Sequence, residues 1–318
     1  MARANEPLLS VPYRVDYNGW FTIKVQVNGH GPYDFVIDTG ATQSLIFQNL
    51  ADIRNFPPTG GPGQTVLGLT AQGAFPTYTV AELRMGSLSL QNLTTVILPD
   101  WSVDRKPSGV IGLDFLSRYI CVFDAPNGLL HFYAPDNGPT TLNKWRSTGL
   151  KPNDFGLPAD PVYVIEARID ARRVRFMLDL GASGTVINKS AAGKISNRGV
   201  SVSIRPSGGD ARARITDSLE KSVEARTIKT RRIRVGKTYW YNRALEIHNA
   251  TIFDELGVQK KPFGLFGADL LRNMSFALDF PGERLHIGPR GPIPRGPIPH
   301  ETELHETVPG ETRPGAEP

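Results

Sequence analysis

Residues 33–46 read YDFVIDTGATQSLI, and this stretch decides how the rest of the chain is interpreted. An apolar run, Phe35-Val36-Ile37, ends abruptly in the acid Asp38, and Thr39 and Gly40 follow it. An unpaired carboxylate is costly to bury, because burial removes it from water or forces it to take up a proton. An acid at the end of a buried strand is therefore either a turn cap or a working carboxylate, and a single copy of the pattern does not decide between the two.

A second copy occurs at residues 175–188, which read RFMLDLGASGTVIN, and it aligns with the first without a gap so that Asp179 corresponds to Asp38. Further along, VIGLDFLSRYICVFDAPNGLLHF from Val110 aligns with LFGADLLRNMSFALDFPGERLHI from Leu265, again without a gap. Two matched blocks in the same order indicate one ancestral unit used twice, with a period longer than that of solenoid repeats. We therefore expect two paired lobes. The aligned loop residues are Thr39, Gly40, Ala41 and Thr42 in the first copy and Leu180, Gly181, Ala182 and Ser183 in the second.

Length and composition are those of an ordinary soluble globular protein. The chain has 318 residues, 40% of them hydrophobic and 21% charged, which is enough for two lobes with separate cores. No apolar run approaches the roughly 18 residues of a membrane-spanning helix. Cys121 is the only cysteine, so no intrachain disulfide can form. Ala2-Arg3-Ala4, just before Asn5, resembles the end of a cleaved secretion signal.

The hydrophobic pattern predicts a mostly β protein. Residues 20–27 alternate between apolar and polar, Asn28-Gly29 suits a tight turn, and the apolar run to Ile37 returns antiparallel. The second copy repeats this hairpin, so each acid lies just past the second strand of a hairpin. Helical periodicity is limited to short turns expected after Asp38, Asp114, Asp179 and Asp269.

Residues 65–80 predict a further hairpin, followed by strands at 81–85 and 88–98. Glycines with apolar neighbours suit a flap that covers a cleft, although the hairpin taken alone is equally typical of an ordinary surface hairpin. The predicted flap residues are Leu69, Thr70, Ala71, Gln72 and Gly73.

Changes in composition predict the boundaries of the lobes. We expect an N-terminal lobe at 15–135, a linker rich in Pro, Gly, Asn and Asp at 136–160, and a C-terminal lobe at 161–288. Residues 289–318 are rich in Pro and Gly and predict a disordered tail. Its His300-Glu301 and His305 miss the zinc-binding HExxH spacing by one residue, so we expect no metal site there.

The repeated Asp-x-Gly-Ala-Thr/Ser motif is joined in each copy by two apolar residues and a glycine, Val110-Ile111-Gly112 and Leu265-Phe266-Gly267. Together these motifs resemble the retropepsin/pepsin clan of aspartic proteases, and most of all the bacterial retropepsin-like proteases with two lobes in one chain. The match extends over about residues 17–288. The resemblance implies an all-β bilobal fold, with two homologous barrel-like lobes related by a pseudo-two-fold axis and a hairpin flap over the cleft.

The same resemblance implies the site and its partners. Asp38 and Asp179 become the catalytic pair of an aspartic endopeptidase that activates a water, with Gly112 and Gly267 threading beside the catalytic loops. It implies a protein or peptide substrate, no metal or cofactor, and a monomer that forms an intramolecular pseudo-dimer. Pairing of Asp38 with the same residue of another chain is disfavoured, since an internal partner is present. With Ala2-Arg3-Ala4 it also indicates export to a bacterial periplasm.

Two departures from the family pattern matter. Leu180 stands where the family has a hydroxyl residue that bonds across to the opposite loop, and losing one such hydrogen bond costs on the order of 1 kcal/mol. The alternative function is therefore a peptide-binding or regulatory pseudoprotease with a relaxed second loop.

Ala41 and Ala182 stand where pepsins tend to place a hydroxyl that lowers the pKa of the carboxylate, which predicts a less acidic pH optimum than that of pepsins.

The net positive charge is concentrated in residues 205–237, which hold ten basic and four acidic side chains in a chain of net charge +5. A solvated face is one explanation. The other is a docking surface for an acidic protein or an anionic membrane. Nucleic acid is not expected as a partner, because aromatic residues are not interleaved with the basic ones before Tyr239-Trp240-Tyr241.

Overall fold

The structure is a computed structural model. It describes residues 5–67, 72–156, 161–196, 214–216, 222–224, 226–249 and 251–295. Outside these ranges lie the residues read as a signal remnant, the flap residues Leu69, Thr70 and Ala71, about half of the basic segment, and the tail after 295. Within the described part, no helix has both the length and the apolar character needed to cross a membrane.

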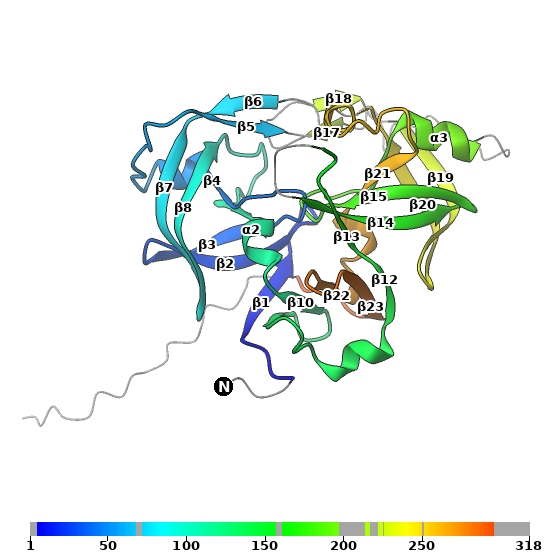
Figure 1. Cartoon of the computed structure of the whole chain (residues 1–318), viewed down its shortest axis with the longest axis horizontal. Coiled ribbons are helices and arrows are strands. Elements are labelled where there is room, and N and C mark those ends of the chain that lie inside the picture. Colours follow the sequence, from blue (N-terminus) through cyan, green and yellow to red (C-terminus); the bar gives the residue numbers. More distant parts are fainter. Residues whose placement is uncertain are drawn as a thin grey trace, which may run out of the picture.

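The fold is mostly β and has two lobes, as the sequence predicts (Figure 1). The strands of the first half are β1 (Leu9–Val15), β2 (Phe21–Val27), β3 (His30–Ile37), β4 (Leu45–Phe47), β5 (Gln64–Leu67), β6 (Gln72–Phe75), β7 (Thr77–Met85), β8 (Leu88–Leu98), β9 (Gly109–Ile111), β10 (Ile120–Asp124) and β11 (Leu129–Tyr133). Those of the second half are β12 (Arg146–Gly149), β13 (Lys151–Asn153), β14 (Val162–Ile169), β15 (Arg172–Leu178), β16 (Val186–Ile187), β17 (Arg214–Thr216), β18 (Ser222–Glu224), β19 (Arg226–Val235), β20 (Thr238–Ile247), β21 (Phe263–Phe266), β22 (Met274–Asp279) and β23 (Arg284–Arg290).

The two predicted hairpins form, and their turns use the backbone conformation that such turns require. Asn28 and Gly29 between β2 and β3 have φ values of 51° and 76°. Asp170 and Ala171 between β14 and β15 have φ values of 46° and 73°. Positive φ at both central residues matches the right-handed twist of the flanking strands, which fixes the register that carries each acid to the end of its strand.

One sheet joins the two halves of the chain, which the sequence did not predict. Strand β10 pairs with β22, with Val122 opposite Ala277, so that β22, β23 and β12 extend the sheet of the N-terminal half. Phe123 and Phe276 stack across this junction with ring centroids 4.2 Å apart. The duplication reveals which strands are equivalent but not which strands pair, and this pairing ties the two halves of the chain together.

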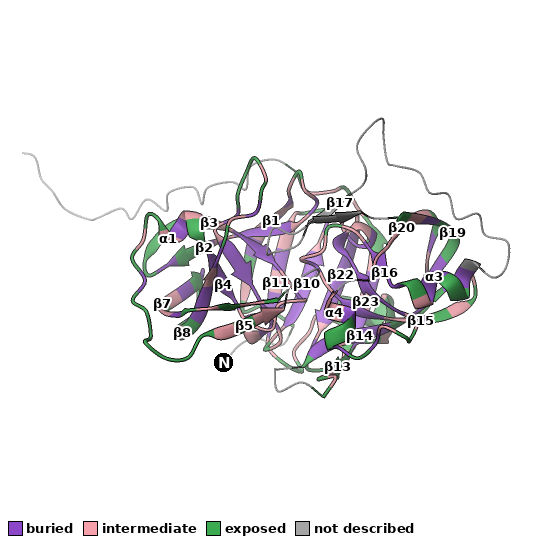
Figure 2. Cartoon of the chain, turned by 90° about the horizontal axis from the view of Figure 1, so that it is seen from above, coloured by how far each residue is buried: buried purple, intermediate pink, exposed green. Residues whose placement is uncertain are grey.

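Buried residues, coloured purple in Figure 2, lie in the interior of both lobes. The helical turns predicted after Asp114 and Asp269 are present as α2 (Leu113–Leu116) and η2 (Ala268–Leu270). A short turn also follows Asp179, where the N–H of Ala182 donates to the carbonyl of Asp179 at 3.3 Å. The turn predicted after Asp38 is wrong, because the carbonyl of Ala41 in that loop accepts from the N–H of Leu113 in α2. The remaining helices are α1 (Gln48–Ala51), α3 (Lys189–Ser196), α4 (Thr251–Glu255) and η1 (Thr140–Lys144).

The described chain continues past the predicted start of the tail. Strand β23 pairs with β22 up to Arg290, so it overlaps the first two residues of the predicted tail, 289–318. The lobe boundaries at 135 and 161 stay a prediction.

Candidate active site

Each acid is held by the same local arrangement at the end of a strand. Strand β3 pairs parallel with β9 and ends just before Asp38, whose N–H donates to the carbonyl of Ile111 at 3.0 Å. Strand β15 pairs parallel with β21 and ends just before Asp179, whose N–H donates to the carbonyl of Phe266 at 3.1 Å. Because both anchors are backbone bonds, the sequence copies produce matched positions for the two carboxyl groups.

The two loops that follow meet face to face. A Cβ atom at Gly40 would lie 2.8 Å from Cγ of Asp179, and one at Gly181 would collide with the carboxyl group of Asp38. Each carboxyl group therefore lies against the glycine of the opposite loop, and any side chain there would push the acids apart. The carboxyl groups of Asp38 and Asp179 are hydrogen-bonded to each other.

Backbone N–H groups hold both acids. Asp38 accepts from the N–H of Gly40 at 2.7 Å and also from those of Ala41 and Gly181. Asp179 accepts from the N–H of Ala182 at 3.0 Å and from that of Gly181. These N–H groups favour the ionised form of the acid that they contact.

Burial and proximity keep a proton on the pair. Burial raises the pKa of Asp38, and its backbone hydrogen bonds partly offset this rise. Burial and then the negative charge of Asp38 raise the pKa of Asp179 well above the ordinary range. Two carboxylates in contact cannot both ionise without a large electrostatic penalty, so the pair titrates as a unit. The pair therefore holds one proton between its two carboxyl groups.

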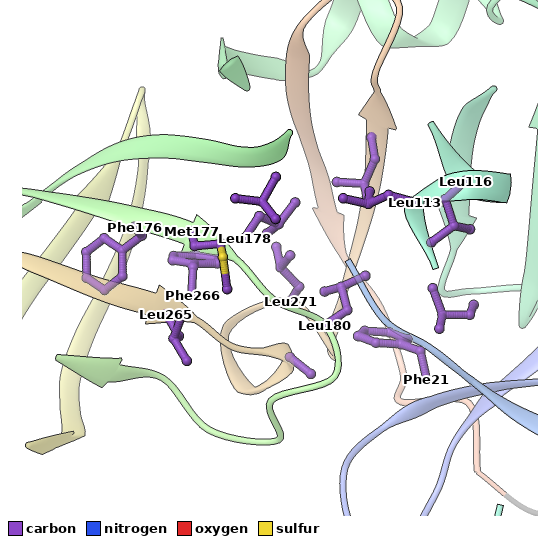
Figure 3. Packing of buried hydrophobic residues seen from close by; sticks show 14 of the residues in the cluster. Phe21, Leu113, Leu116, Phe176, Met177, Leu178, Leu180, Leu265, Phe266 and Leu271 are labelled. Atoms are coloured by element: carbon purple, nitrogen blue, oxygen red, sulfur yellow. The ribbon is translucent and has the colours of Figure 1, made fainter. Parts of the chain in front are cut away.

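A single hydroxyl links the two loops. Thr39 is fully buried, and its Oγ1 donates to the carbonyl of Leu178 at 2.9 Å and accepts from the N–H of Leu180 at 3.0 Å. Leu180, at the equivalent position, has no hydroxyl to return these bonds. Its side chain is instead fully buried in the apolar cluster that contains Phe21 and Leu271 (Figure 3). The link predicted from the sequence is therefore one-sided, and apolar packing takes the place of the missing half.

Gly112 and Gly267 lie beside the loops, as the resemblance implies. A Cβ at Gly112 would lie 2.6 Å from the carbonyl carbon of Gln43, and one at Gly267 would lie 2.9 Å from the carbonyl oxygen of Ala182. Glycine is needed at both positions because the neighbouring atoms belong to the backbone and cannot move aside.

Four supporting residues were missed by the sequence analysis. Asp114 Oδ1 accepts from Ser44 Oγ at 2.7 Å, and Ser44 Oγ accepts from the N–H of Gly112 at 3.0 Å. In the second copy, Thr185 Oγ1 donates to Asp269 Oδ1 at 2.6 Å and accepts from the N–H of Gly267 at 3.1 Å. Burial raises the pKa of both Asp114 and Asp269. The sequence did contain a signal for them. Ser44 and Thr185 each follow an acid of the pair by six positions, and Asp114 and Asp269 align in the second matched block.

The acids lie in a cavity of about 540 Å³, within the usual size range of ligand pockets. Of the other predicted loop residues, Thr42 and Ser183 also line it. Its walls are apolar on both sides and include two tryptophans that the sequence analysis missed. The N-terminal lobe contributes Trp20, Leu45, Phe47, Trp101 and Val103, and the second half of the chain contributes Phe155, Val162, Met177, Ile252, Leu256 and Leu265.

The predicted flap hairpin is present as β5 and β6, which pair from Gln64 opposite Phe75 to Leu67 opposite Gln72. Its first strand lines the cavity, and Gln64 Nε2 donates to Gln43 Oε1 of the first acid loop at 2.8 Å. Gln72 and Gly73 belong to β6. The other predicted flap residues lie outside the described part of the chain.

A model of the family described as "Aspartyl protease" matches residues 23–115 and 165–270, which is more than half of the chain. The chain belongs to the aspartyl protease family. This confirms the resemblance found in the sequence and supports a peptidase function. The structure is similar to the crystal structure of the aspartic proteinase from Irpex lacteus, with a TM-score of 0.51 and 14% identity over 89% of this chain and 97% of that one. At that identity the likeness shows the fold alone. Among curated proteins no sequence match was found.

Proposed function

We propose that this aspartyl protease family member is an active endopeptidase in which Asp38 and Asp179 form the catalytic pair. One observation carries the proposal: the two carboxyl groups are hydrogen-bonded to each other inside a cavity large enough for the backbone and neighbouring side chains of a peptide. An acid pair that shares a proton provides a base and an acid at the same place, which hydrolysis of an amide requires.

We assign the shared proton to Asp179, because the charge of Asp38 raises its pKa in addition to burial. Asp38 is then the ionised partner, held by the N–H of Gly40, and accepts a proton from a water molecule whose oxygen attacks the scissile carbonyl carbon. Asp179 donates its proton to the carbonyl oxygen, which gives a neutral tetrahedral diol. In the second half of the reaction, Asp38 passes its new proton to the leaving nitrogen, the C–N bond breaks, and Asp179 recovers a proton from the diol as the carboxylic acid forms. Atoms and charges balance, and the pair returns to its starting state.

Leu180 neither separates the two acids nor displaces the loop that carries Asp179. Its backbone N–H still bonds Thr39, and its side chain fills buried apolar space. The alternative of a peptide-binding pseudoprotease therefore has the weaker support, because the feature that suggested it leaves both carboxyl groups in contact.

We further propose a retropepsin-like enzyme with a less acidic pH optimum than that of pepsins. The described contacts of Asp38 and Asp179 include no hydroxyl from position 41 or 182, both of which are alanine, so the pKa-lowering bond of pepsins has no donor there. The β5–β6 hairpin would act as a flap over a protein or peptide substrate. Both acids belong to one chain, so a monomer would suffice for activity.

The test is digestion of a mixed peptide library by the wild-type protein and by Asp38→Asn and Asp179→Asn variants. We expect internal cleavage by the wild type and loss of cleavage in both variants. Mixing the two variants should not restore activity, because the pair lies within one chain. Binding of peptides without cleavage by the wild type would favour the pseudoprotease, and a profile that peaks well below about pH 4 would contradict the proposed optimum.

A further inference from the structure

The sheet of the second half carries one face that runs outward from the cavity. Along β15 the residues Val174, Phe176 and Leu178 are buried in the core. The alternate residues point to the opposite face, where Arg173 is exposed, Arg175 is half-buried, and Met177 lines the cavity. One strand face therefore leads from the cavity to the surface in three steps.

Strand β14 continues the same face. Val164 is opposite Met177, Glu166 is opposite Arg175, and Arg168 is opposite Arg173. Val162, at the inner end of this face, lines the cavity. The outer end is exposed at both Glu166 and Arg168, so the surface changes from apolar beside the acids to charged at the rim.

Three arginines then meet in one row across three strands. Arg173 on β15 is directly opposite Arg168 on β14, and Arg168 is directly opposite Arg234 on β19. The next position across, on β20, is Tyr239, which lies under the guanidinium of Arg232 at 5.7 Å. We call Arg173, Arg168 and Arg234 the arginine row. Adjacent strands lie about 4.8 Å apart, so this row holds three like charges at close spacing.

Within the described part of the chain, acidic neighbours do not neutralise the row. Residues 162–178 and 226–247 together hold eleven basic and three acidic side chains. Among the described ion pairs, the row has one, between Arg173 Nε and Glu166 Oε2 at 3.6 Å, with both side chains about 60% exposed. A pair so exposed contributes little, and like charges directly opposite each other on a sheet repel. The row is therefore a surface that gains from an added counter-charge.

We infer that the arginine row binds an acidic segment of the polypeptide substrate at a distance from the scissile bond. This inference rests on the proposed function, since it takes the cavity as the place of cleavage. Arg173 lies on β15 six residues before Asp179, a distance of about 20 Å at ~3.3 Å per residue of extended chain. An extended substrate would span it with about six residues. Guanidinium groups suit this occupant because they bind carboxylates through two parallel hydrogen bonds.

Continuity with the cavity favours a polypeptide over other polyanions. A nucleic acid or an anionic membrane would need only an isolated basic face, whereas this row is connected through Arg175 and Met177 to the acid pair. Phe155, which lies 6.0 Å from the guanidinium of Arg175, also lines the cavity. A peptide that occupies the cavity and continues past Phe155 along β15 would meet the row next.

The first experiment starts from a peptide that the wild-type protein cleaves. The peptide is extended, on one side or the other, by a run of glutamates or of glutamines about six residues from the scissile bond, and kcat/KM is measured for each version. We expect about tenfold higher kcat/KM for the glutamate version on one side, mainly through KM, with the advantage lost at high salt. An Arg168→Gln, Arg173→Gln, Arg234→Gln variant should lose this preference and keep its rate on the glutamine peptide. The matched control is the triple variant Arg226→Gln, Lys229→Gln, Arg231→Gln. It removes the same charge from exposed positions of β19 and should keep the preference for glutamate.

A second experiment separates this inference from the proposed function. Binding of a fluorescein-labelled glutamate-rich peptide to the Asp38→Asn variant is followed by anisotropy, so no cleavage is needed. Binding that depends on the arginine row supports the inference even if the wild-type protein cleaves nothing. Equal binding of glutamate and glutamine peptides would overturn it. So would tighter row-dependent binding of a single-stranded DNA oligonucleotide or of phosphatidylserine vesicles, which would assign the row to another class of partner.

Discussion

Replacement of Thr39 by valine tests how the two halves of the active site are held together. The substitution keeps the shape of the side chain and removes one hydroxyl that makes two buried bonds between the loops, to the carbonyl of Leu178 and from the N–H of Leu180. Each backbone group left buried without a partner costs roughly 1–3 kcal/mol, so the free energy of unfolding should fall by about 2–4 kcal/mol. The assay is urea denaturation followed by tryptophan fluorescence, with kcat measured on the folded protein in parallel.

The control is Thr230→Val, since Thr230 is also buried but makes a single bond, to the carbonyl of Arg243 at 3.0 Å, within the sheet of the second half. It should cost about half as much and leave kcat unchanged. For Thr39→Val we expect a large fall in kcat in addition to the loss of stability, because the two carboxyl groups lose their fixed separation. A stability loss no greater than that of the control, with unchanged kcat, would refute the one-sided link.

Three further outcomes follow from the same geometry. Leu180→Thr should lower the free energy of unfolding by about 2 kcal/mol in thermal or urea denaturation, because the loss of a fully buried leucine outweighs one regained hydrogen bond; a more stable variant would contradict this. Gly181→Ala should abolish cleavage in a peptide assay, since the new methyl group displaces the carboxyl of Asp38, whereas Gly193→Ala, where a Cβ would meet nothing within 4 Å, should be active. For Asp179→Asn, the free energy of unfolding relative to that of the wild type should rise as pH increases from about 4 towards the raised pKa of Asp179. The rise should be at most about 1.4 kcal/mol per pH unit, as measured by urea denaturation across pH.

The sign of the last prediction follows from proton binding. Between the ordinary pKa of an unfolded aspartate and the raised pKa of Asp179, the folded wild type holds a proton that the unfolded chain has released. Stability of the wild type therefore falls as pH rises through this window. Asp179→Asn cannot hold that proton, so its stability lacks this dependence. A constant difference between the two proteins across the window would contradict the raised pKa.

The sequence was sufficient for the fold class and the pairing of the acids because the information was local and duplicated. An apolar strand that ends in Asp38, repeated before Asp179, together with two distant glycines, predicted two lobes that each supply an acid. The β2–β3 and β14–β15 hairpins were predictable because turn residues and alternation specify them within about twenty positions.

What could not be predicted depends on contacts between distant parts of the chain. The pairing of β10 with β22 has no local signal in the sequence, because the apolar residues of each strand would suit burial beside any partner strand. The support of the loops by Asp114 and Ser44 joins residues 70 positions apart. Arg168, Arg173 and Arg234 form a row only through strand register, and the basic segment read from the sequence included just one of them.

The most direct test of the shared proton is a pH titration of the carboxyl carbons of aspartates by 13C NMR, in the wild type and in Asp38→Asn. For the wild type we predict one buried aspartate that stays protonated far above the ordinary pKa of about 3.9. Burial and then the negative charge of Asp38 raise this pKa, so in Asp38→Asn it should fall but stay above the ordinary range, because burial remains. Two acids that titrate independently in the wild type, with Asp179 unchanged by the loss of Asp38, would contradict the account.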